Sequence, residues 1–274
     1  MARKSFVTEL PKHAFIWSIL FMAFIPLYLM FIISLKDNVQ FSHNPWLPTL
    51  PFHWENYKVG WEHVGASIWN TMFVAISATV LSLIFGVCGA FFFARYKMPG
   101  SNILFYIFII LMLYPGVANM VPTFKLISSL GLYNTHYALI LLFVAGSQAF
   151  TIYVMRNFIE DLPQDLFDAA DVDGCSPWRQ IWTIVVPLSS PIIGTLGVLR
   201  IIGEWNAFVG PLIMLRDPHK QMIGVRLLFL EGEYTKKWGE MMSGYTIASI
   251  PLIILFLFCM RLFVRGLSEG AIKG

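Results

Sequence analysis

Long apolar stretches alternate with short polar segments along most of this chain. Residues 14–35 form the first stretch, and about 20 apolar residues in a helix cross the roughly 30 Å hydrocarbon core of a bilayer. The same criterion predicts six membrane-spanning helices, at about residues 14–35, 70–94, 103–121, 137–155, 190–215 and 245–264. We therefore expect an all-α membrane protein with a single transmembrane domain over residues 1–274 and both termini on one side.

The pattern of the first apolar stretch does not match that of a signal peptide. It is too long for an h-region, and no A-x-A-like site follows it before Lys36. Arg3, Lys4 and Lys12 precede it and favour a cytoplasmic N-terminus. Residues 36–67, in which Pro45, Pro48 and Pro51 interrupt any regular element, are then expected to form an external loop.

Small residues mark one face of the second predicted span. They recur every fourth position, at Ala78, Ser82, Gly86 and Ala90. Such a stripe lets another helix approach closely where no hydrophobic effect drives association. We interpret it as a packing seam. In the third span, Pro115-Gly116 is expected to bend or break the helix.

A polar segment at residues 156–187 separates the fourth and fifth spans, and its residue order predicts two short helices. Pro163 suits the first helical position, and Gly174 can adopt the positive φ that ends a helix. Ser176 is a natural N-cap in front of Pro177. The second helix should be amphipathic and face a partner or the membrane, because apolar residues recur at helical spacing as far as Pro187: Trp178, Ile181, Trp182 and Val185.

Polar side chains also lie within the predicted spans. Arg200 and Glu204 are one helical turn apart, so they can neutralise each other, or they can serve a translocation pathway. Asn206 and Gln148 need hydrogen-bond partners at membrane depth, which helix packing or a water-filled path can supply. Trp205 has an aromatic face of the type that stacks on sugars, although packing is the commoner role of such a residue.

Composition narrows the function classes. The chain is 57% hydrophobic and 13% charged, as in polytopic membrane proteins. A net charge of +3 without a basic stripe gives no footprint for nucleic-acid binding. The sequence contains no G-x-x-x-x-G-K-[ST] loop and no common hydrolase motif, so we expect a non-enzyme that depends on a separate energy source. The three cysteines and the loop histidines follow no metal-ligand spacing.

The polar segment carries a family resemblance. Asp168-Ala169-Ala170, then Gly174, then an apolar run closing on Pro187-Leu188 resembles the EAA loop of the membrane subunits of binding-protein-dependent ABC importers. Asp168 stands where the family usually has Glu. The ending, residues 266–274, and Glu204-Trp205-Asn206 resemble the MalG-type permeases of carbohydrate importers.

This resemblance implies a type I ABC importer permease fold with a cytoplasmic coupling helix-turn-helix at residues 156–187. It implies contacts with the ATPase through Asp168, Ala169, Ala170, Gly174, Cys175, Trp178 and Arg179, and through the tail at residues 265–274 by Glu269 and Lys273. The candidates for the substrate pathway are the polar and aromatic residues within the spans, Arg200, Glu204, Trp205, Asn206 and Gln148. This chain would bind no cofactor, because ATP and Mg would be held by the ATPase.

The resemblance also implies the partners and the cell membrane concerned. They are a homologous MalF-like permease in a heterodimer, two copies of a MalK-like ATPase, an extracytoplasmic solute-binding protein and a carbohydrate, in the inner membrane of a prokaryote with both termini cytoplasmic. Arg200 suggests that the sugar is acidic, since arginine binds carboxylates in a bidentate way. Two alternatives remain: an ion-gradient-driven secondary transporter that uses Arg200 and Glu204, and a membrane scaffold without transport.

Overall fold

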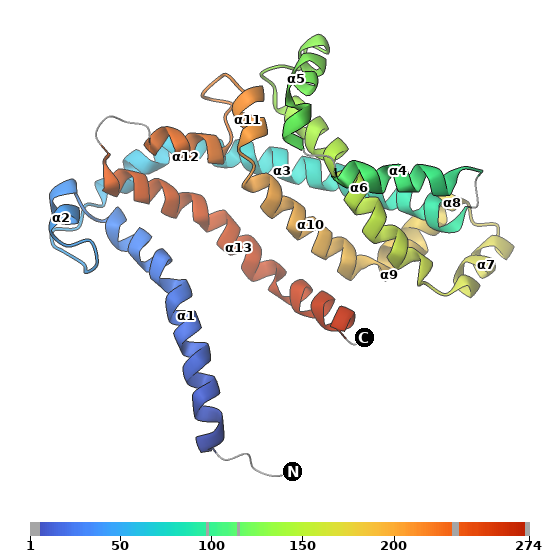
Figure 1. Cartoon of the computed structure of the whole chain (residues 1–274), viewed down its shortest axis with the longest axis horizontal. Coiled ribbons are helices and arrows are strands. Elements are labelled where there is room, and N and C mark those ends of the chain that lie inside the picture. Colours follow the sequence, from blue (N-terminus) through green and yellow to red (C-terminus); the bar gives the residue numbers. More distant parts are fainter. Residues whose placement is uncertain (1–5, 97–98, 114–115, 232–235, 272–274) are drawn as a thin grey trace. The chain divides into compact units, whose positions relative to one another are not determined.

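A computed structural model describes residues 6–96, 99–113, 116–231 and 236–271, and all regular structure within these ranges is helical (Figure 1). The chain divides into two compact units. One contains Met1–Gly65 and Arg226–Ile250, and the other contains Ala66–Val225 and Pro251–Gly274. Two long helices, α3 (Glu55–Arg95) and α13 (Trp238–Ala271), contribute residues to both units.

The remaining helices belong mostly to one unit each. The first unit holds α1 (Phe6–Ser34), α2 (Asn38–His43) and most of α12 (Ile223–Glu231). The second unit holds, in chain order, α4 (Ser101–Leu113), a 3-10 turn (Gly116–Asn119), α5 (Met120–Ser129), α6 (His136–Glu160), α7 (Gln164–Val172), α8 (Pro177–Gln180), a π-helical turn (Ile181–Val185), α9 (Val186–Leu188), α10 (Ser190–Trp205) and α11 (Val209–Met214).

Length and hydropathy identify the helices that can cross a membrane. Among the described residues, four qualify: Pro11–Ser34, Glu55–Arg95, His136–Glu160 and Trp238–Cys259. Pro177–Leu188 and Ser190–Trp205 form a pair bent by 81° that counts as a fifth if it is one span, and Ser101–Leu113 is apolar but shorter. The chain is therefore a multi-pass membrane protein with four to five candidate spans in its described part.

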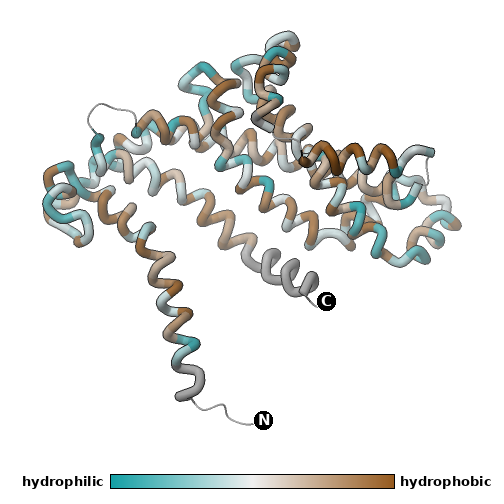
Figure 2. The backbone as a smooth tube through the Cα atoms, in the orientation of Figure 1, coloured by the Kyte–Doolittle hydropathy of each residue, from teal (hydrophilic) through white to brown (hydrophobic). Residues whose placement is uncertain are grey.

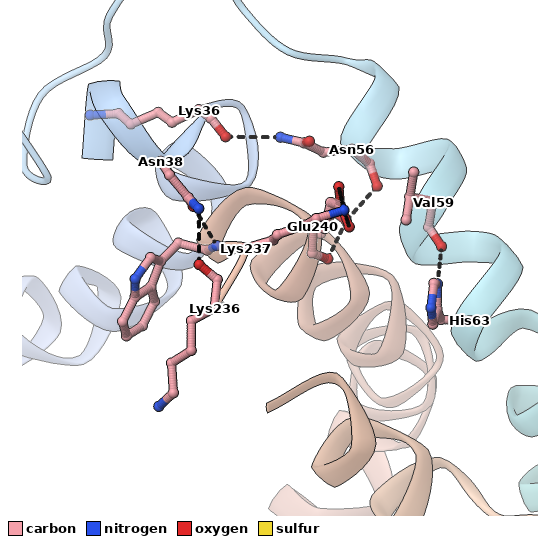
Figure 3. A network of polar contacts seen from close by, with 10 residues as sticks. Lys36, Asn38, Asn56, Val59, His63, Lys236, Lys237 and Glu240 are labelled. Atoms are coloured by element: carbon pink, nitrogen blue, oxygen red, sulfur yellow. Dashed lines mark hydrogen bonds and ion pairs between the residues drawn. The ribbon is translucent and has the colours of Figure 1, made fainter. Parts of the chain in front are cut away.

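Hydrogen bonds to side-chain amides hold the first unit together (Figure 3). Asn56 on α3 donates to the carbonyl oxygens of Ser34 and Lys36, at 2.9 and 3.0 Å. Asn38 on α2 donates to the Lys236 carbonyl at 3.0 Å and accepts from the Trp238 N–H at 3.0 Å. The C-terminus of α1, the N-termini of α3 and α13, and α2 are thus tied to one another.

Lys36 is the least expected member of this unit. Its side chain is only 1% exposed, and its ammonium donates to the backbone carbonyls of Asn44 and Leu47, the latter at 2.6 Å. Burial lowers the pKa of Lys36 from its ordinary value. The lysine therefore ties residues 44–47 to the end of α1 as a structural cation.

In the second unit, α3 packs against α6 along the predicted small-residue seam, which confirms that interpretation. Ala78, Ser82 and Ala90 are fully buried, and Ser147 of α6 donates to the Ser82 hydroxyl at 2.8 Å. A Cβ added at Gly86 would lie 2.4 Å from the Thr151 Cγ2 atom. Only glycine permits this approach of the two helices.

The prediction that residues 36–67 contain no regular element is wrong. Asp37 and Gln40 form a capping box that starts α2, with the Asp37 carboxylate accepting from the Gln40 N–H at 2.7 Å. Helix α3 begins at Glu55, whose charge suits the first turn. The prolines are therefore confined to the short connection between these helices, where they interrupt nothing.

Residues 190–215 form two helices instead of the one span expected. The interruption begins at Asn206, ahead of Pro211. The Asn206 side-chain amide donates to the Ile202 carbonyl at 2.8 Å and so competes with the backbone N–H groups that bond to this carbonyl at the end of α10. Pro211 lies in the first turn of α11, where proline is tolerated. Helix α4 ends at Leu113, directly before the expected break, and Pro115 lies outside the described residues.

Candidate coupling site and intramembrane polar pair

The polar segment folds as two short helices joined by a tight turn, as predicted. Helix α7 ends at Val172, and Gly174 has the positive φ of 69° that the sequence required. The Cys175 N–H donates to the Ala170 carbonyl at 2.8 Å and the Gly174 N–H to the Asp171 carbonyl at 3.1 Å. This pair of bonds is the Schellman motif, so the last carbonyls of α7 have donors without help from a partner.

The starts of the two helices differ in how well the sequence predicts them. Pro163 is the N-cap of α7 and not its first helical residue, because the helix begins at Gln164. For α8 the prediction is confirmed: the Ser176 hydroxyl accepts from the Arg179 N–H at 3.4 Å, and Pro177 is the first helical residue.

A buried glutamine braces α7 against α8. Gln180 is 3% exposed, and its amide donates to the Asp171 carboxylate at 2.5 Å and to the Cys175 carbonyl at 3.4 Å. A hydrogen bond to a charged group is stronger than one between neutral groups. The two helices and the turn between them therefore form a single braced body.

The apolar residues after Ser176 do not share one face. Ile181 and Val185 are fully buried, whereas Trp178 and Trp182 are 57% and 51% exposed. The π-helical turn at Ile181–Val185 adds a residue per turn and shifts the helical register. The two tryptophans are left as an exposed aromatic pair for the partner or membrane that the sequence predicted.

The body of α7 is anchored to the bundle through Phe167 and Arg95. Phe167 is 3% exposed, and the Arg95 guanidinium lies 3.8 Å from its ring centroid. Arg95 also donates to the Gln164 side chain at 2.7 Å, and Gln164 donates to the Asp168 carboxylate at 2.8 Å. The expected coupling residue Asp168 is thus connected to the end of α3.

The opposite face of α7 is open. Val172 is 88% exposed, the largest fraction for any large hydrophobic side chain among the described residues, and Leu166 is 42% exposed. Asp165, Asp168 and Asp173 are also exposed around them, as is Ala169. An apolar side chain so exposed among acids is typical of a surface that a protein partner covers.

Within α10, Arg200 and Glu204 form the pair that their spacing predicted. Arg200 Nε lies 3.9 Å from Glu204 Oε1. Glu204 is 4% exposed, and its other carboxylate oxygen accepts from the Thr79 hydroxyl at 3.4 Å. Arg200 also donates to the Phe143 carbonyl at 3.3 Å. The contacts of this pair tie α10 to α3 and α6.

The other pathway candidates have different surroundings: Gln148 and Trp205 pack within the bundle, whereas Asn206 is exposed. Gln148 donates to the carbonyls of Val144 and Ser82, at 3.0 and 3.4 Å, so it bridges α6 and α3. Trp205 is 6% exposed, and Asn206 caps α10. In the expected tail, the backbone is helical to Ala271, but the side chain of Glu269 and all of Lys273 lie outside the described part of the chain.

Sequence reasoning missed Val172, Phe167, Arg95 and Gln180. Val172 and Phe167 lie within one helical turn of Asp168, and Phe167 with Ala170 marks the buried face of α7 at i, i+3 spacing. That signal was available. The partners of Arg95 and Gln180 are set by tertiary contacts, which no local pattern shows.

Comparisons with known proteins agree with this architecture. The family described as binding-protein-dependent transport system inner membrane component matches residues 82–269. A solved structure described as a bacterial ABC transporter involved in the import of the acidic polysaccharide alginate contains a chain with a TM-score of 0.82 and 21% identity, covering 95% of this chain and 98% of that one. This likeness concerns the fold.

Two curated relatives come from Bacillus subtilis (strain 168). The probable ABC transporter permease protein YurM is 30% identical over 276 residues, covering 99% of this chain and 91% of the relative. The melibiose/raffinose/stachyose import permease protein MelC is 30% identical over 254 residues, covering 92% of each. The chain therefore belongs to the binding-protein-dependent transport system inner membrane components and is the permease subunit of an ABC importer, not itself an enzyme.

Proposed function

We propose that this chain is the MalG-type permease of an importer for a carbohydrate, an oligosaccharide. The relative MelC, a melibiose/raffinose/stachyose import permease protein, supports this substrate class. Membership of the family implies an ATPase and a solute-binding protein as partners. The complete assembly in this proposal pairs the chain with a homologous permease and adds two ATPase copies, which hold the ATP and Mg.

The proposed topology is the type I fold with six spans. The four long candidate helices, the α10 region and the shorter apolar α4 supply them. Six spans place both termini on one side, and the basic residues before α1 favour the cytoplasm. The loop formed by α7 and α8, which we call the coupling loop, then lies in the cytoplasm, and unit 1 offers its loops to the solute-binding protein.

In the proposed mechanism, α7 is the contact through which the ATPase moves the permease. The coupling contacts are Asp168, Ala169, Ala170, Gly174, Cys175, Trp178 and Arg179, joined by Glu269 and Lys273 of the tail. Closure of the ATPase dimer displaces α7, and the braced body transmits the motion to α10. The cavity between the two permeases then opens alternately to the two sides of the membrane.

The exposed side chain of Val172 is the observation that carries this proposal. Burying a valine side chain contributes about 1.5 kcal/mol or more. Because Val172 is 88% exposed, nearly all of this free energy becomes available when a partner covers the side chain. Replacement by aspartate removes this contribution and buries a charge in the interface. The variant Val172→Asp should therefore weaken association with the ATPase at least tenfold.

The experiment uses the complete complex in proteoliposomes, with the solute-binding protein and radiolabelled sugar outside and ATP inside. Wild-type uptake should require ATP and resist an uncoupler, and Val172→Asp should abolish it together with ATPase pull-down. Val39→Asp is the matched control for the ATPase pull-down, because Val39 is 64% exposed on α2, away from the coupling loop in sequence. Uptake that survives without ATP and stops with the uncoupler would favour a secondary transporter.

The substrate pathway in this proposal contains Arg200, Glu204, Trp205, Asn206 and Gln148, with Arg200 selecting an acidic sugar. Replacing Arg200 together with its partner, as Arg200→Gln with Glu204→Gln, removes the cation without leaving an unpaired carboxylate. Uptake of an acidic oligosaccharide should then fall relative to a neutral one. An equal rate for both sugars in wild type and variant would remove Arg200 from the pathway.

A further inference from the structure

A polar hollow lies in the second unit where α3 ends, α4 begins and α6 meets the coupling loop. Its volume of about 940 Å³ is within the range of small-molecule sites. Two arginines line it, Arg95 from α3 and Arg156 from α6. Further polar lining residues are Asn102 from α4, Glu160 at the end of α6 and Gln164 at the start of α7. Neither the coupling contacts nor the substrate pathway uses this hollow.

The residues that line the hollow carry a net charge of +1, because the two arginines face one carboxylate, that of Glu160. Arg156 pairs with Glu160, with Nη2 2.9 Å from Oε1, so this pair is neutral. Arg95 donates only to neutral oxygens, those of Gln164 and of the Ile159 and Leu162 carbonyls, and within the described ranges no ion pair joins it to a carboxylate. Its Nε atom has no hydrogen-bond partner there either.

Helix α4 continues from the hollow as an apolar surface. Ser101 and Asn102 begin the helix at the hollow, and the first N–H groups of a helix have no acceptors within it. Beyond them, exposed apolar side chains follow along the helix: Ile103, Leu104, Tyr106, Ile107, Ile110 and Leu111. Figure 2 shows this helix among the most hydrophobic parts of the chain. A polar cationic site thus adjoins a surface suited to hydrocarbon chains.

We propose that the hollow binds the phosphate headgroup of an anionic glycerophospholipid, whose acyl chains lie along α4. A guanidinium presents a planar set of donors that fits phosphate oxygens, and basic hollows between membrane helices on the cytoplasmic side bind such headgroups. The proposed function enters only in placing this end of the bundle at the inner leaflet, because Gln164 starts the coupling loop.

The same guanidinium connects the lipid to the coupling site. Arg95 holds the turn before α7 through the Ile159 and Leu162 carbonyls, at 2.6 and 3.0 Å, and packs on Phe167. A phosphate that contacts Arg95 would therefore fix the position of the guanidinium that anchors α7. ATPase activity of the assembled complex should accordingly be higher in vesicles that contain anionic lipid.

The test is lipid binding to the purified complete complex, measured by native mass spectrometry with dioleoylphosphatidylglycerol and dioleoylphosphatidylcholine. Asn102 is exposed in the hollow, and within the described part of the chain its side chain makes no hydrogen bond, so it carries the charge changes. One charge near the membrane surface changes affinity about fivefold. Asn102→Glu should weaken phosphatidylglycerol binding about fivefold, and Asn102→Lys should strengthen it by a similar factor.

Lys125→Gln is the matched control, because Lys125 is exposed on α5 of the same unit but does not line the hollow. Its lipid affinity should equal that of wild type. Equal binding of the two lipids, or no response to either Asn102 variant, would overturn the proposal. Displacement by an equal concentration of inorganic phosphate would assign the hollow to a free anion, and binding only in the absence of the ATPase would assign it to a protein contact. These measurements do not depend on sugar uptake, so they fail separately from the proposed function.

Discussion

Replacing Gly86 by alanine should destabilise the contact between α3 and α6. The new Cβ would lie 2.4 Å from Thr151 Cγ2 and 3.0 Å from Thr151 Cβ, whereas non-bonded carbons prefer about 3.5–4.0 Å. Thr151 is fully buried, and its hydroxyl donates to the Ser147 carbonyl at 3.0 Å, so rotating it away sacrifices that bond. Overpacking of this kind costs about 1–3 kcal/mol, which exceeds the roughly 0.5–1 kcal/mol that alanine gains over glycine within a helix.

The assay is reversible unfolding of the purified permease complex in mixed micelles, followed by tryptophan fluorescence. Thr151→Ser removes the clashing methyl and keeps the hydroxyl, so the double variant should recover most of the loss. Gly146→Ala on α6 is the control, because a Cβ there meets no atom within 4 Å, and its stability should be unchanged or slightly higher. If Gly86→Ala costs the same free energy with and without Thr151→Ser, the steric reasoning is wrong.

Three further substitutions test contacts outside this seam. Lys36→Met leaves the Asn44 and Leu47 carbonyls without their donor and should lower the free energy of unfolding of the first unit by about 2 kcal/mol, measured by protease cleavage between α2 and α3. Gln180→Leu breaks the bond to the Asp171 carboxylate and should speed amide hydrogen exchange in α7 about tenfold. Arg200→Gln leaves the buried Glu204 carboxylate unpaired and should lower the unfolding free energy of the complex by about 3 kcal/mol, with most of it restored by Glu204→Gln.

For each of these three substitutions, one result would contradict the expected physical cause. Lys58→Met changes an exposed lysine of the same unit, so equal cleavage of both lysine variants would show that burial of Lys36 contributes nothing. Unchanged exchange after Gln180→Leu would mean that the turn alone holds α7 and α8 together. If Glu204→Gln fails to restore stability, the loss comes from packing of the Arg200 side chain.

The membrane helices could be predicted from hydropathy. In a bilayer the backbone N–H and C=O groups of an apolar segment must form hydrogen bonds within that segment, so a sufficiently long apolar run forms an α-helix. The seam at Gly86 was also readable, since small residues at every fourth position share a face. Helix α2 was not readable in the same way. It has no apolar periodicity, and its start depends on the capping box of Asp37 and Gln40, a short polar signal inside a segment that otherwise resembles a loop.

In the coupling loop, the residue types near the turn predict its backbone, whereas tertiary contacts determine which side chains are buried. Gly174 and Ser176 specify backbone geometry through their own φ angle and hydroxyl, and both behave as their types require. The burial of Ile181 and the exposure of Trp178 could not be predicted, because tertiary contacts decide which of these two neighbouring apolar side chains faces the bundle. Arg95 is far from the loop in sequence, so no local sequence pattern indicates its contact with Phe167.

The bracing of the coupling loop restricts where a displacement of α7 can be absorbed. The Schellman bonds and Gln180 make α7 and α8 one body, so a push on Val172 must carry both helices. The first break in regular helix after this body lies at Ser189, between Pro177–Leu188 and Ser190–Trp205, where the axes differ by 81°. Helix α10 follows directly and carries Arg200 with its partner. In the proposed mechanism, rotation about this bend would convert motion of the loop into motion of the polar pair inside the bundle, without requiring either helix to unfold.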